Sequence, residues 1–142
     1  MPRMSRTWMS VLLLAAFAGC DGAASVKRDK EISHVGAVTT LYFRAKSTLG
    51  KPPASEQEFK EVIAQDNVDP GVLGVGSVDE LFVSDRDGQP LVVDYAQTSP
   101  QGVVVYEQVG KDGVRLVGFT SGQIEEADAA KFALLVPKPA KP

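Results

Sequence analysis

Three aspartates in the second half of the chain carry carboxylates of the kind that bind calcium. Asp85 and Asp87 lie in the sequence DRDG, which has the opening spacing of a calcium-binding loop, and Asp94 follows in the next apolar run. Carboxylate oxygens are the ligands that Ca²⁺ prefers. The acidic residue that would close such a loop is missing, and Asp-Gly between two apolar runs is also typical of a hairpin turn. We therefore expect a turn, keep the three aspartates as weak metal candidates, and expect no cofactor.

A second acidic group surrounds the Gly-rich segment 66–80. Its members are Asp66, Asp69, Asp79 and Glu80. These carboxylates can bind a cation or a small ligand, although solvated loop carboxylates are the commoner arrangement. Within the segment, GVLGVG at residues 71–76 has the glycines of a phosphate loop but lacks its Lys-Ser/Thr ending. The segment 66–80 stays as an alternative binding site, and its expected conformation is a loop with a short extended piece at 72–75.

The only histidine, His34, and three tyrosines complete the candidates for chemistry. His34 has the side chain of a general base, but it directly precedes an apolar stripe that begins at Val35, which favours a helix-surface or partly packed histidine. No serine lies in a G-x-S-x-G elbow. Tyr42, Tyr95 and Tyr106 can form a binding surface, but tyrosines in such elements usually belong to the core. We expect no catalytic residue and no enzymatic activity.

The single cysteine, Cys20, lies directly after an apolar run near the start of the chain. Two arginines precede the run from Trp8 to Ala18, which is too short to cross a bilayer but has the length of a secretory signal. The sequence FAGC, Phe17 to Cys20, resembles the lipobox of bacterial lipoproteins, with Phe17 in the place where that family usually has Leu. A disulfide within one chain is excluded, because Cys20 has no partner.

The lipobox resemblance implies that residues 1–19 are a signal peptide and that Cys20 carries acyl chains on its sulfur and its amino group. Several acyl chains on one residue anchor a protein stably, whereas one chain does so only marginally. Residues 20–28 would then form a lipidated tether, and the domain would face the extracytoplasmic side of the cell envelope. In some Gram-negative bacteria, lipoproteins that are retained in the inner membrane have Asp directly after the lipidated cysteine, and Asp21 resembles that residue. The choice between the inner and the outer membrane stays open. The alternative is an ordinary secretory signal with an incidental cysteine.

Size and charge limit the classes of function. Without residues 1–19 the chain keeps 123 of its 142 residues, enough for one domain. Loss of Arg3 and Arg6 leaves 13 basic against 18 acidic residues, a balance of −5. This charge disfavours binding to nucleic acid and broad adhesion to anionic lipid, because both require a basic surface. The acyl chains on Cys20 are therefore the expected membrane contact.

Two helices are expected in the first half of the domain. Apolar residues recur at spacings of three and four over residues 29–49, and Gly50 followed by two prolines ends this amphipathic helix. A second, short helix follows in ASEQEFKEVIA, where Ser55 and Glu58 have the spacing of a capping box. Phe59 begins its buried face.

The second half is predicted to form two hairpins. Residues 81–84 and 91–96 are β-branched and aromatic on either side of the turn DRDGQP. Residues 103–109 and 114–121 likewise flank the turn GKDG. Val103, Val105 and Glu107 alternate with Val104, Tyr106 and Gln108, which predicts a sheet with one covered face and one partly wet face.

The last apolar segment, 124–136, is predicted to be a short helix with acidic residues in its first turn. The elements together predict one α+β domain over residues 29–136, with a four-stranded antiparallel sheet made from two hairpins. A tail rich in Pro and Lys follows at residues 137–142.

The order of these elements resembles the globular part of type II secretion pseudopilins and related pilin-like domains. The matching stretch runs from Tyr42 to Phe59, with Gly50, Pro53 and Ser55 at the break between the helices, and continues through residues 81–121. Pilin-type proteins use a long apolar helix as membrane span and fibre core, and a lipobox stands in that place here. The resemblance thus implies an interaction domain more than a filament subunit. We expect a lipid-anchored domain with a non-enzymatic interaction or structural role in the envelope and an unidentified protein partner.

Overall fold

The computed structural model describes residues 33–138. Four α-helices, one 3₁₀ helix and four strands follow one another in this range, namely α2 (His34–Leu49), α3 (Glu56–Gln65), η1 (Pro70–Leu73), α4 (Val78–Leu81), β1 (Val92–Val93), β2 (Val103–Tyr106), β3 (Arg115–Phe119), β4 (Ile124–Ala127) and α5 (Ala129–Leu135). No helix within the described range is long and apolar enough to span a bilayer.

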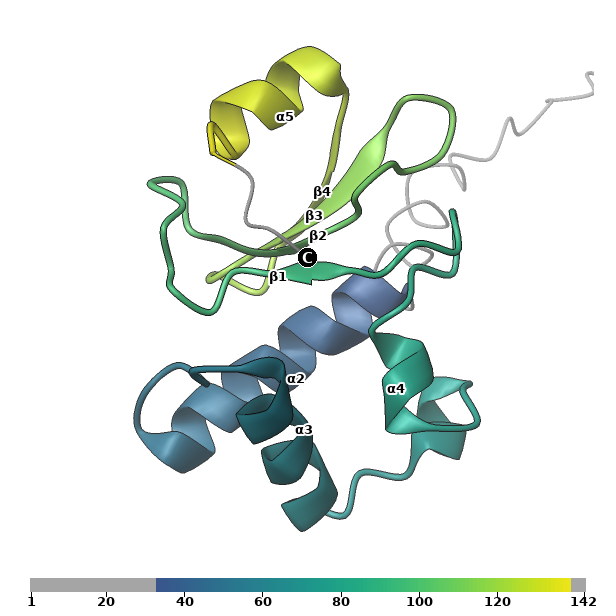
Figure 1. Cartoon of the computed structure of the whole chain (residues 1–142), viewed down its shortest axis with the longest axis vertical. Helices are drawn as coiled ribbons and strands as arrows, with labels where there is room; N and C mark the ends of the chain where they lie inside the picture. The colour runs from purple at the N-terminus through teal and green to yellow at the C-terminus, as the bar shows by residue number, and fades with distance from the viewer. Residues whose placement is uncertain (1–32, 139–142) are drawn as a thin grey trace, which may run out of the picture.

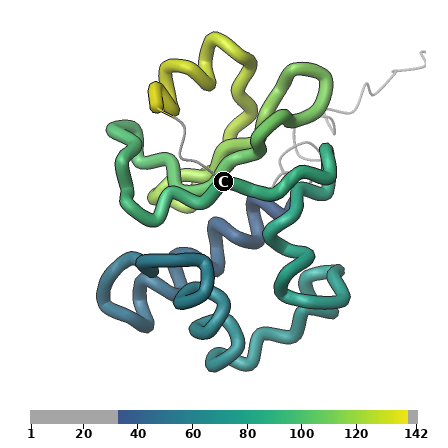
Figure 2. The backbone as a smooth tube through the Cα atoms, in the orientation of Figure 1, coloured from purple at the N-terminus to yellow at the C-terminus, as the bar shows by residue number. Residues whose placement is uncertain are grey.

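The four strands form one antiparallel sheet in the order β1-β2-β3-β4, with helices on both faces (Figure 1). Helices α2, α3 and α4 lie on one side of the sheet, and α5 lies on the other (Figure 1). The backbone trace shows the same division, with the first half of the described chain below the sheet and α5 above it (Figure 2). The predicted α+β class with an antiparallel sheet is therefore confirmed, and helices lie on both faces of the sheet (Figure 1).

Helices α2 and α3 follow the sequence prediction closely. The Ser33 hydroxyl accepts from Gly36 N and caps α2, so the helix begins at His34, and its end is Gly50 at φ 68°. Residues 29–32 of the predicted helix lie outside the described residues. Ser55 caps α3 by accepting from Glu58 N, as a capping box requires. The Glu58 carboxylate, however, accepts from Ala54 N at 2.6 Å, one residue before the cap.

The loop prediction for residues 66–80 is partly wrong. Asp69 caps η1 by accepting from Gly71 N, and Pro70 occupies the first helical position, where its fixed φ is favourable. Ser77 caps the four-residue helix α4 by accepting from Glu80 N. Residues 72–75 are therefore not extended, because local capping groups favour helical turns over a strand.

The first predicted hairpin is also wrong in its first strand. Leu81 ends α4, and residues 81–84 form no strand of the sheet. They make an isolated bridge between Val83 and Pro90, and the N–H groups of Leu91 and Ser84 donate to the Phe82 and Gln89 carbonyls. The strand that follows, β1, is two residues long and pairs with β2. The sheet still has four strands, because residues 124–127 supply β4 where the sequence predicted helix.

The second hairpin is confirmed, but it contains a bulge that changes which side chains share a face. Val103 is opposite Phe119 and Val105 is opposite Gly118, so two residues of β2 face one of β3. Val104 and Val105 consequently both pack on the α2 side, while Val103 packs on the α5 side. The alternation predicted along residues 103–109 is therefore wrong at Val104 and Val105.

The predicted C-terminal helix is divided into a strand and a helix. Residues 124–127 pair with β3, and the Asp128 carboxylate accepts from Lys131 N to start α5. Glu125 and Glu126, predicted in the first helical turn, therefore lie in β4.

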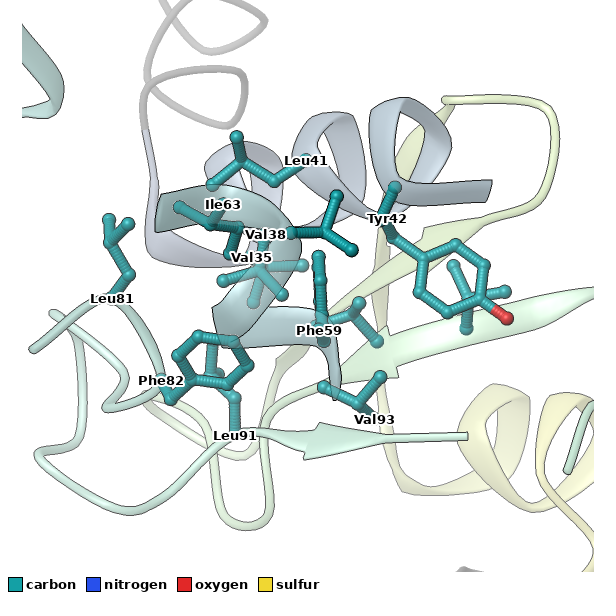
Figure 3. Packing of buried hydrophobic residues seen from close by; sticks show 14 of the residues in the cluster. Val35, Val38, Leu41, Tyr42, Phe59, Ile63, Leu81, Phe82, Leu91 and Val93 are labelled. Atoms are coloured by element: carbon teal, nitrogen blue, oxygen red, sulfur yellow. The ribbon is translucent and has the colours of Figure 1, made fainter. Parts of the chain in front are cut away.

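The larger core lies between the sheet and α2, α3 and α4, and Phe59 of α3 is near its centre (Figure 3). The Phe59 ring makes edge contacts with Tyr42 at 5.8 Å, Phe82 at 5.5 Å and Tyr95 at 6.4 Å between centroids. Such aromatic pairs contribute about 0.5–1.5 kcal/mol beyond their area burial. A smaller core packs between the other face of the sheet and α5, with Tyr106 against Phe132.

Candidate functional site

The predicted lipidation residue, Cys20, lies outside the described residues, together with the signal peptide and the tether. The first described residue, Ser33, is 13 positions after it. Because an extended chain spans at most about 3.3–3.6 Å per residue, this segment reaches at most about 45 Å. The lipidation of Cys20 stays a prediction from the sequence.

His34 and Asp85 meet at the start of α2, where both hold the fold together. The Asp85 carboxylate accepts from the backbone N–H of His34 at 3.1 Å, so it provides a negative charge at the helix N-terminus. The His34 ring donates from Nδ1 to the Val83 carbonyl. The histidine therefore fastens α2 to the turn before β1, and its position is that of a partly packed helix residue, as the sequence favours.

Asp87 and Asp94 organise two other turns. Asp87 accepts from Gln89 N at 2.8 Å and from Gly110 N at 2.6 Å, which joins the turn before β1 to the turn between β2 and β3. Asp94, 5% exposed, accepts on Oδ2 from Thr98 N, Thr98 Oγ1 and Ser99 N. The two carboxylates thus bind backbone amides of separate loops.

The weak metal candidates are not brought together. Within residues 33–138, no group of three His, Cys, Asp or Glu side chains is placed to hold a metal ion. Each acidic residue of segment 66–80 also has a contact inside the domain: Asp66 with Arg44 at 2.9 Å, Asp69 with Gly71 N at 2.8 Å, Asp79 with Lys60 at 2.7 Å and Glu80 with Gly76 N at 2.8 Å. These contacts stabilise turns and helix ends.

The three tyrosines belong to the cores, as the sequence favours, and they do not form one surface. Tyr42 and Tyr95 pack with Phe59 on the α2 side of the sheet, whereas Tyr106 packs with Phe132 on the α5 side. Burial raises the pKa of the Tyr42 hydroxyl, and the hydrogen bond that it accepts from Gln97 opposes this only in part. Burial likewise raises the pKa of Tyr95, so both phenols stay neutral and apolar in character.

A buried ion pair that the sequence did not reveal lies beneath the turn at residues 84–90. The Glu107 side chain is completely buried and accepts from Ser84 Oγ at 2.8 Å, Arg86 Nη1 at 3.1 Å and Leu116 N at 2.7 Å. Arg86 also donates to the Val114 carbonyl. Glu107 thus has donors on both oxygens, and the network ties the turn to strands β2 and β3.

A hollow with a volume of about 640 Å³ lies between α2 and η1 in the described part of the chain. We call it the α2–η1 groove. It is lined by Ala37, Thr40, Leu41 and Arg44 of α2 and by residues 66–69 and 72–73. Its volume lies within the range of about 300–1,000 Å³ that is usual for ligand pockets.

The α2–η1 groove combines apolar lining with charged edges. Leu41 is 6% exposed, and Val68 and Leu73 are half-buried, whereas Val72 is 82% exposed. Val72 is the most exposed of the large hydrophobic side chains in residues 33–138. The groove therefore offers apolar surface from Leu41, Val68 and Leu73, with the exposed Val72 beside them.

A smaller cavity of about 210 Å³ lies near the end of α5. Asp94, Ser99 and Tyr106 line it together with residues 136–138. Ser99 donates to the Leu135 carbonyl and accepts from Val103 N, so its hydroxyl connects the loop before β2 to α5. The polar groups of this cavity hold the loop and α5 together.

No family model, curated protein or solved structure matches this chain. The resemblances to the lipobox and to pilin-like domains accordingly stay predictions from the sequence. Function is inferred from the chain's own residues, and the α2–η1 groove is the candidate functional site.

Proposed function

We propose that this chain is a lipid-anchored extracytoplasmic domain with a non-enzymatic interaction role in the cell envelope. The anchor is Cys20, and the contact surface is the α2–η1 groove. The observation that carries the interaction role is the groove itself, with Leu41, Val68 and Leu73 in its lining and Val72 in water at its edge. The lipobox resemblance at Phe17 to Cys20 supports the anchor.

The uses of the polar side chains support the same role. His34, Asp85 and Asp87 hold α2 and the turns around β1, and Glu107 is enclosed by three donors. Asp94 organises the loop before β2. The side chains with the residue types of acid–base or metal chemistry are thus engaged in the fold, whereas the groove is open to a partner.

The 13 positions from Cys20 to Ser33, which include the predicted tether at residues 20–28, fit an anchored interaction domain. This segment allows Ser33 to lie up to about 45 Å from the membrane surface, so the domain can approach a partner in several orientations. Anchoring also confines the domain to a thin layer, which raises the effective concentration of a partner in the same membrane.

Site-specific photo-crosslinking in cells tests the groove as a contact surface. A photoreactive amino acid replaces the exposed Thr40 of the groove in the full chain, and a matched variant carries it at Leu134, which is 75% exposed on α5. We expect a discrete adduct from position 40 that position 134 does not give. Equal patterns at the two positions would contradict the groove as the contact surface.

A further inference from the structure

We propose that the cavity near the end of α5 binds a small apolar amino acid, with the ammonium group of the ligand on Asp94 and its carboxylate on Lys138. This cavity, of about 210 Å³, shares no lining residue with the α2–η1 groove. The inference therefore goes beyond the proposed interaction role and does not depend on it. Two opposite charges and apolar walls around one small cavity are the observations that carry it.

Asp94 brings a carboxylate to this cavity with one oxygen in use and the other open. The side chain is 5% exposed, and its Oδ2 accepts from Thr98 N at 2.7 Å, Thr98 Oγ1 at 3.0 Å and Ser99 N at 3.0 Å. Within residues 33–138, no hydrogen bond or ion pair reaches Oδ1. Because Asp94 lines the cavity, Oδ1 is the oxygen that a ligand there can contact.

The open oxygen of Asp94 favours a ligand with a charged donor. A buried carboxylate oxygen without a donor is unfavourable, because the interaction with water that it has lost is not replaced. Hydrogen bonds between a carboxylate and an ammonium group are shorter and about twice as strong as those between neutral groups. An ammonium group is therefore the best match for this end of the cavity.

The loop that carries Asp94 is held in place on two elements. Asp94 N donates to the Val104 carbonyl at 2.8 Å, which fixes the start of the loop on β2. The Ser99 hydroxyl accepts from Val103 N at 3.2 Å and donates to the Leu135 carbonyl at 3.1 Å, which fixes the end of the loop on β2 and α5. The carboxylate is thus positioned before a ligand binds, so binding orders few protein groups.

The other lining residues select the rest of the ligand. Val103, Tyr106 and Val136 are 1%, 2% and 6% exposed and provide an apolar wall, whereas the exposed Lys138 supplies a positive charge. A purely cationic ligand would approach the like charge of Lys138, and a purely anionic ligand that of Asp94, and both approaches are unfavourable. A zwitterion with an apolar side chain meets all these requirements.

The volume of the cavity limits the size of the ligand. About 210 Å³ lies below the range of about 300–1,000 Å³ that is usual for drug-sized ligands. A single free amino acid is a ligand of suitably few atoms.

Isothermal titration calorimetry of the purified full chain tests this site. The probes are L-alanine, L-valine and L-leucine, so the result does not depend on one side-chain size. Two analogues of leucine each lack one of its charges: isoamylamine has no carboxylate, and isocaproate has no ammonium group. The melting temperature of the chain with each probe gives a second readout.

We expect at least one of the amino acids to bind with one molecule per chain and to raise Tm. Isoamylamine should bind about tenfold or more weakly than leucine, because it loses the contact with Lys138, and isocaproate should not bind. No binding by any of the amino acids would overturn the proposal and leave a hydrated carboxylate only. Isoamylamine or isocaproate binding as tightly as leucine would overturn the amino acid as the ligand class.

Two variants assign the charges to their residues. Asp94→Asn keeps one oxygen for the amides of the loop and puts an NH₂ group in place of Oδ1, so the affinity for the amino acid should fall about tenfold or more. Lys138→Gln should weaken the amino acid in the same way and leave isoamylamine no weaker. Lys111→Gln, which neutralises an exposed lysine outside the cavity, is the matched control.

These variants can contradict the proposal even if one of them does not fold. The melting temperature of each unliganded variant shows whether it folds. Lys138 is exposed, so Lys138→Gln should keep the native Tm and remains informative if Asp94→Asn unfolds. An affinity for the amino acid that either folded variant leaves equal to that of Lys111→Gln would overturn the proposed site.

Discussion

Removing the carboxylate of Glu107 should destabilise the domain strongly while leaving the groove untouched. The Glu107→Ala variant leaves three donors without their acceptor: Ser84 Oγ, Arg86 Nη1 and Leu116 N. Breaking a buried ion pair by removing one partner typically costs about 3–5 kcal/mol. The Arg86 side chain is 20% exposed, so water partly solvates it, and the expected cost lies near the lower end, at about 3 kcal/mol.

The same cost can be stated as a shift in melting temperature. The described domain has 106 residues, from 33 to 138. With an unfolding entropy of about 2.1 cal/mol/K per residue, a loss of about 3 kcal/mol lowers Tm by about 13 °C. Thermal unfolding followed by circular dichroism, with urea unfolding as a second measure, tests this.

A double-mutant cycle separates the ion pair from simple loss of packing. Glu107→Leu combined with Arg86→Met replaces both charges by apolar groups, and such replacements of buried pairs are often neutral or stabilising. Ser84 Oγ and Leu116 N still lose their acceptor in the double variant, so we expect it to recover only the part of the loss in Glu107→Ala that comes from the unpaired Arg86. A cost below about 1 kcal/mol for Glu107→Ala, or equal costs with and without Arg86, would refute the structural role of the pair.

Three further predictions concern close packing, pH and the groove. Gly118→Ala places a Cβ 2.0 Å from Thr39 Oγ1, so urea unfolding should show a loss of about 1–3 kcal/mol, and unchanged stability would contradict the close approach of α2 to β3. The Ala54 N–H lowers the pKa of Glu58 below its ordinary value, so its stabilisation is present above that value and is lost as the pH falls. Glu58→Gln should therefore flatten the fall of Tm below about pH 5, and superimposable pH profiles would count against this bond. Val72→Asp should change the unfolding free energy by no more than about 0.5 kcal/mol while abolishing the position-40 adduct, and a large loss of stability would mean that Val72 belongs to the core.

Apolar spacing and capping residues are enough to predict the helices on the first face of the sheet. Val35, Val38, Leu41 and Tyr42 lie at spacings of three and four and are all buried in α2. Ser55 and Glu58 place the start of α3 correctly. These signals are local, so they can be detected without knowledge of the tertiary fold.

The errors occur where tertiary pairing overrides the local pattern. Glu125 and Glu126 are good residues for a first helical turn, but pairing with β3 places them in a strand, and Asp128 delays the helix. The bulge in β2 adds one residue opposite β3 and puts Val104 and Val105 on the same face. Neither pairing nor bulge has a signal in the order of apolar and polar residues.

The candidate site is the part that the sequence predicts least. Arg44 and Val72 are 28 positions apart and line the same groove only when residues 66–73 pack beside α2. The one available signal is Val72 itself, an apolar residue within the Gly-rich sequence PGVLG. The burial of Glu107 could not be predicted from the sequence either, because a glutamate in a predicted hairpin strand is typically an exposed charge.

The state of Cys20 tests the central claim most directly. Intact mass and membrane fractionation are measured for the native full-length gene product beside Cys20→Ser. We expect the native chain to begin at residue 20 with added acyl mass and to sediment with membranes, and we expect Cys20→Ser to lose both properties. If both proteins are soluble and carry no lipid, the claim of a lipid-anchored domain is contradicted.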